Sequence, residues 1–263
     1  MKDGRVVSWI KEEKIAIITI NNLPVNTLNM YVIQQLADAL KEIENDVDVV
    51  AVIITGTGEK AFVAGGDIKE FPDWIGKGER YAEMKSLGLQ HPLNKVERLS
   101  KPTIAAINGL ALGGGCELAI ACDLRVIEEH ALIGLPEITL GLFPGAGGTQ
   151  RLPRLIGEGK AKEMMFIGKP ISAQEAKEIG LANFVVAKGQ ALEKAKEIAN
   201  EISRFSLPAL SYMKQAIYEG TAVSLEDGLH IEAKYFGKVF QTEDVKEGVT
   251  AFIEKRVPHF SNK

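Results

Sequence analysis

The sequence predicts an α/β fold, in which a parallel sheet is covered by helices and is followed by a helical C-terminal region. Two continuous apolar runs, residues 49–54 and 103–107, consist mainly of β-branched residues and alanine, and glycines follow both. Such runs are typical of strands that are buried on both faces. After about Gly189 the apolar residues recur with helical period instead. Strands and helices in the first two thirds, then helices alone, define this class.

The other elements follow from local patterns along the chain. Residues 15–20 are predicted to form a strand because β-branched residues dominate them, and Asn29 is a predicted N-cap for the helix that follows. A helix is expected near residues 79–87, within a polar stretch (residues 73–92) that either covers a ligand site or forms an ordinary surface helix. Further short strands are predicted at residues 124–127, 131–134 and 183–186.

Two capping signals mark helices in the second half of the chain. Ser172 and Glu175 form a capping box, and Gly180 has the position of a matching C-cap. Ser224 is expected to begin a later helix. The inward face of that helix is predicted to carry Leu225, Leu229, Ala233, Phe236 and Phe240.

Composition excludes several classes of protein. The 263 residues carry 31 basic and 35 acidic side chains, a net charge of −4, which argues against nucleic acid as the main partner. No apolar run reaches membrane-spanning length, and the N-terminus shows no leader pattern, so no membrane partner and a cytoplasmic location are expected. Cys116 and Cys122 share one apolar segment, which favours reduced core residues. The histidines lack ligand spacing, so no metal site is expected.

Two glutamates carry the strongest functional signal. Glu117 lies in a mostly apolar run, where a carboxylate costs free energy unless a partner stabilises it. Glu137 follows Pro136, a residue that often opens a helix. Taken alone, either glutamate is also compatible with a purely structural role. Two carboxylates that face one cleft can divide acid and base roles, so the pair predicts an enzyme that moves protons or water.

Two glycine-rich segments, residues 61–70 and 109–117, share one pattern: a buried strand or turn, then glycines, then a helix start. Free N–H groups at a helix N-terminus point toward negative charge, and two of them from separate loops can form an oxyanion hole. A tight turn is the simpler alternative for either segment alone. No P-loop and no G-x-S-x-G elbow is present in the sequence, which disfavours nucleotide hydrolysis and serine chemistry.

At these residues the chain resembles the crotonase family, also called the enoyl-CoA hydratase/isomerase superfamily. Five motifs carry the resemblance in the family's order and spacing. They are Ala-Gly-Gly-Asp-Ile-Lys at 64–69, Lys-Pro-Thr-Ile-Ala-Ala-Ile-Asn-Gly at 101–109, Gly-Gly-Gly-Cys-Glu-Leu-Ala at 113–119, Pro-Glu-Ile-Thr-Leu-Gly at 136–141 and Pro-Gly-Ala-Gly-Gly-Thr-Gln-Arg-Leu at 144–152.

The resemblance implies a crotonase-like (Clp-type) spiral of ββα units with a C-terminal helical trimerisation region. Residues 1–195 would form the spiral core with the acyl-CoA and catalytic site. Residues 196–263 would form the helical region for oligomerisation and active-site capping. The implied partners are an acyl-CoA thioester substrate and further copies of the chain, as a homotrimer or a hexamer made of two trimers.

The resemblance also assigns roles to single residues. Glu117 and Glu137 would be the catalytic carboxylates, and the N–H groups of Gly66 and Gly114 would form the oxyanion hole. The CoA part of the substrate would contact Ala64, Gly66, Ile68, Lys69 and Gly145. No separate cofactor is expected, because CoA is part of the substrate.

The presence of both glutamates favours an enoyl-CoA hydratase that adds water across the 2,3 double bond of a 2-enoyl-CoA, in fatty-acid β-oxidation or amino-acid breakdown. A methylglutaconyl-type hydratase and an enoyl-CoA double-bond isomerase remain open. A non-catalytic RNA-binding member of the family is opposed by the acidic balance and by the intact glutamate pair. Clp-type proteases share the spiral, but no Ser/His/Asp set stands at matching positions.

Overall fold

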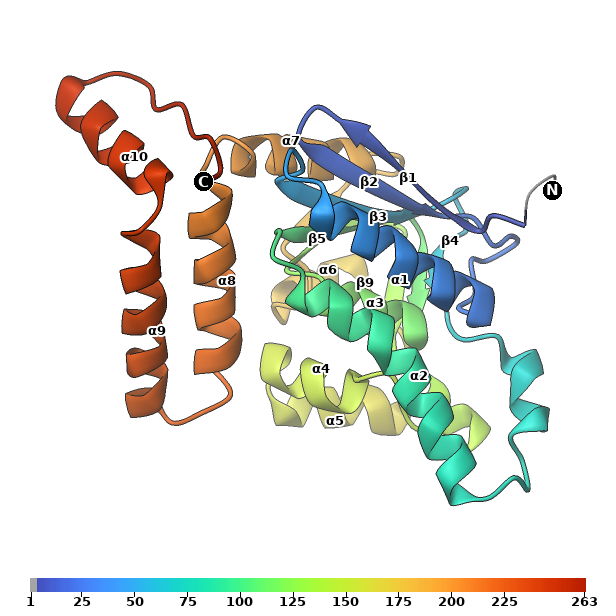
Figure 1. Cartoon of the computed structure of the whole chain (residues 1–263). Helices are drawn as coiled ribbons and strands as arrows, with labels where there is room; N and C mark the ends of the chain where they lie inside the picture. Colours follow the sequence, from blue (N-terminus) through green and yellow to red (C-terminus); the bar gives the residue numbers. More distant parts are fainter. Residues whose placement is uncertain (1–3) are drawn as a thin grey trace.

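A six-stranded sheet forms one wall of the molecule in the computed structural model, which describes residues 4–263 (Figure 1). Its spatial order is β1-β2-β3-β5-β7-β10, and all neighbours are parallel except β1 and β2. The strands are β1 (Val7–Glu12), β2 (Ile15–Ile20), β3 (Ala51–Gly56), β5 (Thr103–Ile107), β7 (Leu124–Glu128) and β10 (Phe184–Val186). The apolar runs predicted as buried parallel strands are thus confirmed as β3 and β5.

A second, four-stranded sheet runs in the order β4-β6-β8-β9. Its strands are β4 (Ala61–Ala64), β6 (Leu110–Leu112), β8 (Leu132–Gly134) and β9 (Ile171–Ser172), of which β4, β6 and β8 are parallel. Successive strands alternate between the sheets: β3, β5 and β7 lie in the first, and β4, β6 and β8 in the second. A helix follows each pair, so the chain winds as the expected spiral of ββα units.

The helices of the spiral pack against these sheets and against one another. They are α1 (Met30–Asn45), η1 (Ile68–Asp73), α2 (Glu79–Arg98), α3 (Gly114–Ala121), η2 (Glu137–Leu140), α4 (Gly148–Ile156), α5 (Glu158–Ile167) and α6 (Ala173–Glu178), where η denotes a 3-10 helix. Asn29 caps α1, because its side chain accepts a hydrogen bond from Val32 N. The helix expected near residues 79–87 is longer than predicted, since α2 continues through Pro92.

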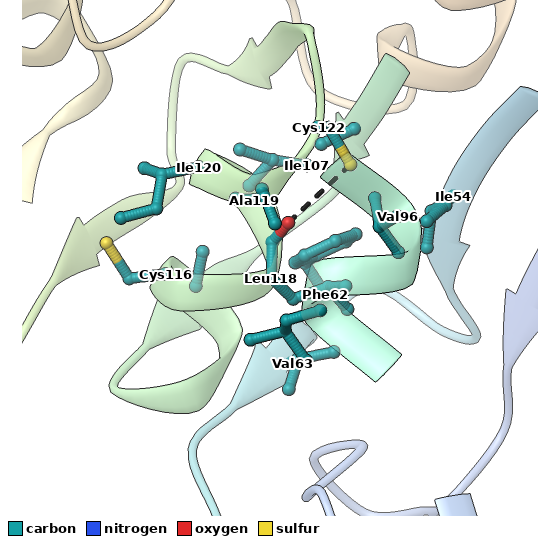
Figure 2. Close-up of a cluster of buried hydrophobic side chains, with 14 of the residues drawn as sticks. Ile54, Phe62, Val63, Val96, Ile107, Cys116, Leu118, Ala119, Ile120 and Cys122 are labelled. Carbon is teal, nitrogen blue, oxygen red and sulfur yellow. Dashed lines mark hydrogen bonds between the residues drawn. The ribbon is translucent and has the colours of Figure 1, made fainter. Parts of the chain in front are cut away.

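Helix α3 lies in the main core. Every residue from Gly115 to Ala121 is buried, and Figure 2 shows its apolar side chains packed with those of neighbouring strands and α2. The Cys122 thiol donates to the Leu118 carbonyl oxygen over 3.5 Å, and both cysteines are free and buried. Glu117 is the only ionisable carboxylate in this helix. Its backbone is therefore fixed by packing around the whole circumference of the helix.

The last four helices are α7 (Ala191–Ile202), α8 (Leu207–Gly220), α9 (Leu225–Val239) and α10 (Glu243–Glu254). Helix α7 packs its alanines on the outer face of the six-stranded sheet. It also spans the expected domain boundary at 195/196, a division that stays a prediction. Helices α8 and α9 form a hairpin beside the rest of the molecule (Figure 1).

The predicted inward face of α9 is wrong for this chain by itself. Ser224 caps the helix as expected, but Leu225 and Phe236 are 80% and 64% exposed, and Leu229 and Phe240 are exposed too. The helical period was assigned correctly, but the apolar stripe points away from the chain's own core. Tyr235 is the buried residue of α9.

Within the described residues, no helix is both long and apolar enough to pass through a bilayer. Residues 1–3, on which part of the leader expectation rests, lie outside the described residues.

Candidate active site

Three segments meet at the carboxyl ends of the parallel strands in the four-stranded sheet. Gly65–Gly66 follow β4, Gly113–Gly114 follow β6, and the segment leading to Glu137 follows β8. The Gly113 N–H donates to the Gly134 carbonyl over 2.9 Å, which ties two of the segments together. Ligands of α/β sheets bind beyond the carboxyl ends of the strands. The topology therefore places the sequence-predicted catalytic residues at one edge.

Gly66 and Gly114 form a pair of neighbouring amides. A Cβ atom on Gly114 would lie 3.6 Å from Gly66 N, so the two backbones are in contact distance. Within residues 4–263, neither N–H donates a hydrogen bond to a protein acceptor. Gly114 is the first residue of α3, where intrahelical acceptors are missing for geometric reasons. Two free donors beside the positive end of a helix suit a developing oxyanion.

Glu117 is buried to 3% exposure in the first turn of α3. Its Oε1 accepts hydrogen bonds from the N–H groups of Ala146 (2.7 Å) and Gly148 (2.8 Å). Burial raises the pKa of Glu117, whereas these two amides and the charge of Arg151 oppose the rise. Oε2 accepts no hydrogen bond in the described part of the chain. One oxygen is therefore held in place and the other is free for chemistry.

Glu137 opens η2, and its Oε1 lies beside Gly113, where a Cβ atom would come within 3.0 Å. Pro136 occupies the N-cap position rather than the first helical position that the sequence suggested. Burial raises the pKa of Glu137 to about 7, and the negative charge of Glu117 adds to the effect. Oε2 of Glu137 is buried without a hydrogen-bond partner among the described residues, which further disfavours ionisation.

Because the folded pKa of Glu137 lies above its usual value of 4.5, the stability that its proton supplies should be lost as pH rises through about 7. The variant Glu137→Gln lacks this titration. Its Tm relative to wild type should therefore increase between pH 5 and pH 8, with a difference in unfolding free energy of at most about 3 kcal/mol. Thermal unfolding at a series of pH values measures this, with exposed Glu129→Gln as the control. A Tm gap that stays constant with pH would contradict the assignment.

The residues expected to contact CoA fall into two groups. Ala64 ends β4, and Ile68 and Lys69 lie on η1, so these three border the Gly66 amide. Gly145 lies in a different segment, directly before Ala146, whose N–H donates to Glu117. Their contacts with CoA stay a prediction.

One large cavity has neither of the paired carboxylates in its lining. Its volume is about 1060 Å³, and it lies between α8 on one side and α2 and α4 on the other. Its lining includes Gln90, Glu97 and Arg151, but neither Glu117 nor Glu137. Because the titratable groups and the free amides lie elsewhere, we place the chemistry at the strand ends and not in this cavity.

The amides of Ala146 and Gly148 were not predicted as partners of Glu117. The Pro-Gly-Ala-Gly-Gly motif at 144–148 was visible, but a backbone donor has no side-chain signal. Arg151 and its partner Glu97 were missed as well, although an arginine at a half-buried helix start is a signal for a buried ion pair.

Two carboxylates beside two free amides define a site that can polarise a carbonyl and transfer protons next to it. Comparisons with known proteins agree. The sequence matches the family model described as enoyl-CoA hydratase/isomerase over residues 10–263. The chain therefore belongs to the enoyl-CoA hydratase/isomerase family, as the five motifs predicted.

Individual relatives are similar over nearly the whole chain. The short-chain-enoyl-CoA hydratase of Clostridium acetobutylicum is 45% identical over 257 residues, which cover 96% of this chain and 97% of that one. The crotonyl-CoA hydratase of Syntrophomonas wolfei is 44% identical over 254 residues, 96% of each chain. A crystal structure of an enoyl-CoA hydratase from Bacillus anthracis has a TM-score of 0.92 at 43% identity, covering 98% of this chain and all (100%) of the other.

Proposed function

We propose that the protein is an enoyl-CoA hydratase, which adds water across the 2,3 double bond of a 2-enoyl-CoA to give a 3-hydroxyacyl-CoA. The observation that carries the proposal is the presence of Glu117 and Glu137 at one strand edge beside the free amides of Gly66 and Gly114. The names of the two bacterial relatives support the same reaction.

In the proposed mechanism, the thioester carbonyl oxygen accepts hydrogen bonds from Gly66 and Gly114. These bonds strengthen as negative charge develops on the oxygen, which lowers the barrier. The oxygen of a water molecule forms a bond to C3 while Glu117 takes one of its protons. Glu137, whose raised pKa keeps a proton available near neutral pH, delivers a proton to C2. Transfer of the Glu117 proton back to Glu137 restores the starting state.

For the rest of the substrate, we propose that Ala64, Gly66, Ile68, Lys69 and Gly145 contact CoA, and that no separate cofactor takes part. Among the described residues, no group of three or more His, Cys, Asp or Glu side chains is placed to hold a metal ion. We propose a cytoplasmic role for this reaction in fatty-acid β-oxidation.

The function is tested by following the conjugated-thioester absorbance of crotonyl-CoA with purified protein. Rapid loss of absorbance with formation of 3-hydroxybutyryl-CoA is expected. An isomerase would give a different result. It would not hydrate crotonyl-CoA or longer and branched 2-enoyl thioesters, but it would convert a 3-enoyl-CoA to its 2-enoyl isomer.

We further propose that the C-terminal helices assemble the chain into a homotrimer, or into a hexamer of two trimers. Large apolar side chains on α9 and α10 are exposed in the single chain, among them Phe236 (64%) and Phe252 (85%). An apolar surface of this kind marks a protein–protein interface.

The substitution Phe236→Glu should therefore shift the protein to lower mass, because a charge would be buried without a partner at the interface. Light scattering after size-exclusion chromatography measures the mass. Lys234→Glu, an exposed position across the same helix, is the control and should leave the mass unchanged. Equal masses for Phe236→Glu and wild type would place the interface elsewhere.

A further inference from the structure

Glu117 depends on one loop for its hydrogen bonds. Both donors to its Oε1, Ala146 N and Gly148 N, belong to residues 144–148, which lead into α4. We call this segment the 144–148 loop. No side chain among the described residues donates to the Glu117 carboxylate. A displacement of the loop by an ångström would therefore weaken the two bonds that favour the ionised carboxylate.

Polar side chains of α2 hold the outer side of this loop. The Gly145 carbonyl accepts hydrogen bonds from Ser86 Oγ (2.6 Å) and Gln90 Nε2 (3.1 Å). The neighbouring Ala146 carbonyl accepts one from Arg151 Nη1 (3.2 Å). The carbonyls of two successive residues are thus held from outside, and the amides of Ala146 and Gly148 point inward to Glu117.

Arg151 is itself fixed by α2. Its Nε and Nη2 bind the two carboxylate oxygens of Glu97 over 3.0 and 2.8 Å, and Nη2 also donates to Asn94 Oδ1 over 2.6 Å. The Arg151 side chain is only 11% exposed, and a two-pronged pair of this kind is both strong and directional. Gly147 has a φ of +113°, and a Cβ atom there would overlap Arg151 Nη1, so the loop and the guanidinium group fit only with glycine.

The four α2 residues form one stripe. Ser86, Gln90, Asn94 and Glu97 are spaced by four, four and three positions, which places them on one helix face. We call them the α2 stripe. They line the large cavity and not the strand edge that carries the two glutamates, so they do not touch the reacting atoms.

We propose that the α2 stripe and Arg151 are positioning residues, which hold the 144–148 loop so that Glu117 keeps its two amide bonds and its capacity to act as a base. The inference rests on the proposed hydratase function for the role of Glu117. The titratable or charged groups that surround Glu117 are Glu137 from η2, Arg151 from α4, Glu97 behind Arg151 on α2, and the Cys116 thiol on α3 itself.

Two substitutions separate positioning from simple charge effects. Arg151→Lys keeps the positive charge but lacks the planar fork that reaches Glu97, Asn94 and the Ala146 carbonyl together. If Arg151 positions the loop, the pKa of Glu117 should be higher in Arg151→Lys than in wild type. If Arg151 acts through its charge alone, the pKa of Glu117 should be the same in both. Glu97→Gln leaves Arg151 with an uncompensated charge, which by itself would lower the Glu117 pKa. Loss of positioning would raise it, so the sign of the shift decides between the two.

The experiment measures the pH dependence of kcat/KM for crotonyl-CoA hydration in wild type, Arg151→Lys and Glu97→Gln. The ascending limb of the profile reports the pKa of the base in the free enzyme. Loss of a hydrogen bond to the Glu117 carboxylate should move this limb to higher pH, by about one unit in Arg151→Lys and by a smaller amount in Glu97→Gln. We expect kcat at the plateau to fall about tenfold in Arg151→Lys with little change in KM, because the base is misplaced while the thioester site is intact. The matched control is Glu83→Gln, at an exposed position one turn before Ser86 on α2, and its kinetics should equal those of wild type.

An infrared titration of the protonated carboxyl band gives a readout without turnover. The band is assigned to Glu117 by its loss in Glu117→Gln. A shift of this titration in Arg151→Lys supports the positioning role even if wild type hydrates no 2-enoyl-CoA. Failure of wild type to hydrate any 2-enoyl-CoA would overturn the proposed function but not the positioning role. Two results with an active wild type would overturn the positioning role and leave the proposed function in place. In the first, Arg151→Lys changes neither the ascending limb of the pH profile nor the titration of the Glu117 carboxyl band. In the second, Glu97→Gln moves the ascending limb to lower pH.

Discussion

Replacing Glu117 with glutamine should lower kcat for crotonyl-CoA hydration by about 10²–10⁴-fold, the range for loss of a general base. Glutamine keeps an oxygen that can accept hydrogen bonds from the N–H groups of Ala146 and Gly148, so the 144–148 loop should stay in place. The variant no longer takes a proton from water. Steady-state kinetics at the pH optimum, together with Tm, separates this loss from unfolding.

The buried position of Glu117 makes the comparison of variants informative. Glu117→Gln removes a buried charge without leaving a cavity, and we expect its Tm to equal or exceed that of wild type. Glu226→Gln, at an exposed position of α9, is the control for the same chemical change and should retain full activity. A Glu117→Gln variant that retains more than a tenth of wild-type kcat would remove Glu117 from the role of base.

The sequence alone was sufficient to select the two glutamates and the two glycines that the structure brings to one strand edge as candidate site residues. Gly66, Gly114 and Glu137 come shortly after strands of the four-stranded sheet, and Glu117 lies in the first turn of the helix that follows β6. Local pattern and family motif therefore select them without knowledge of distant contacts. Polar residues in apolar or glycine-rich surroundings are conspicuous because burying them is costly.

The support of the site could not be predicted in this way. The bonds from Ser86 and Gln90 to the Gly145 carbonyl join residues that are 59 and 55 positions apart. Their acceptor is a backbone atom, which every residue possesses, so the sequence contains no mark of the pairing. The polar stripe on α2 resembled an ordinary solvated helix face until the fold placed the 144–148 loop beside it.

The prediction that the apolar face of α9 points inward failed for another physical reason. Helical period shows that one face of the helix is apolar, but it does not show which surface covers that face. Here the residues Leu225, Leu229 and Phe236 remain exposed in the chain by itself. A periodicity argument that assumes a single chain therefore assigns them to the wrong core, and only assembly with other copies would provide the cover that we propose.

The proposed oxyanion hole can be tested at Gly114, because the amide hydrogen of this residue can be removed without removing the helix. Gly114 is the first residue of α3, a position where proline is tolerated since its N–H has no intrahelical acceptor. Gly114→Pro should therefore preserve α3 but lower kcat by about 10²–10³-fold, the typical cost of losing one donor to a developing oxyanion. Kinetics with crotonyl-CoA, beside circular dichroism for helix content, measures both.

Gly114→Ala is the matched control, since alanine adds a Cβ atom but keeps the N–H. That Cβ would lie 3.1 Å from Leu28 Cδ1, the end of a side chain that can turn away, so a loss of only a fewfold is expected. Both variants place a Cβ atom at the same point, so alanine corrects for crowding of Leu28. Proline in addition replaces the N–H hydrogen with its Cδ, so the ratio of the two variants measures the loss of the donor together with the carbon that takes its place. If the two variants lose activity equally, steric crowding at Leu28 explains the effect, and the thioester oxygen is bound by some other donor than the Gly114 amide.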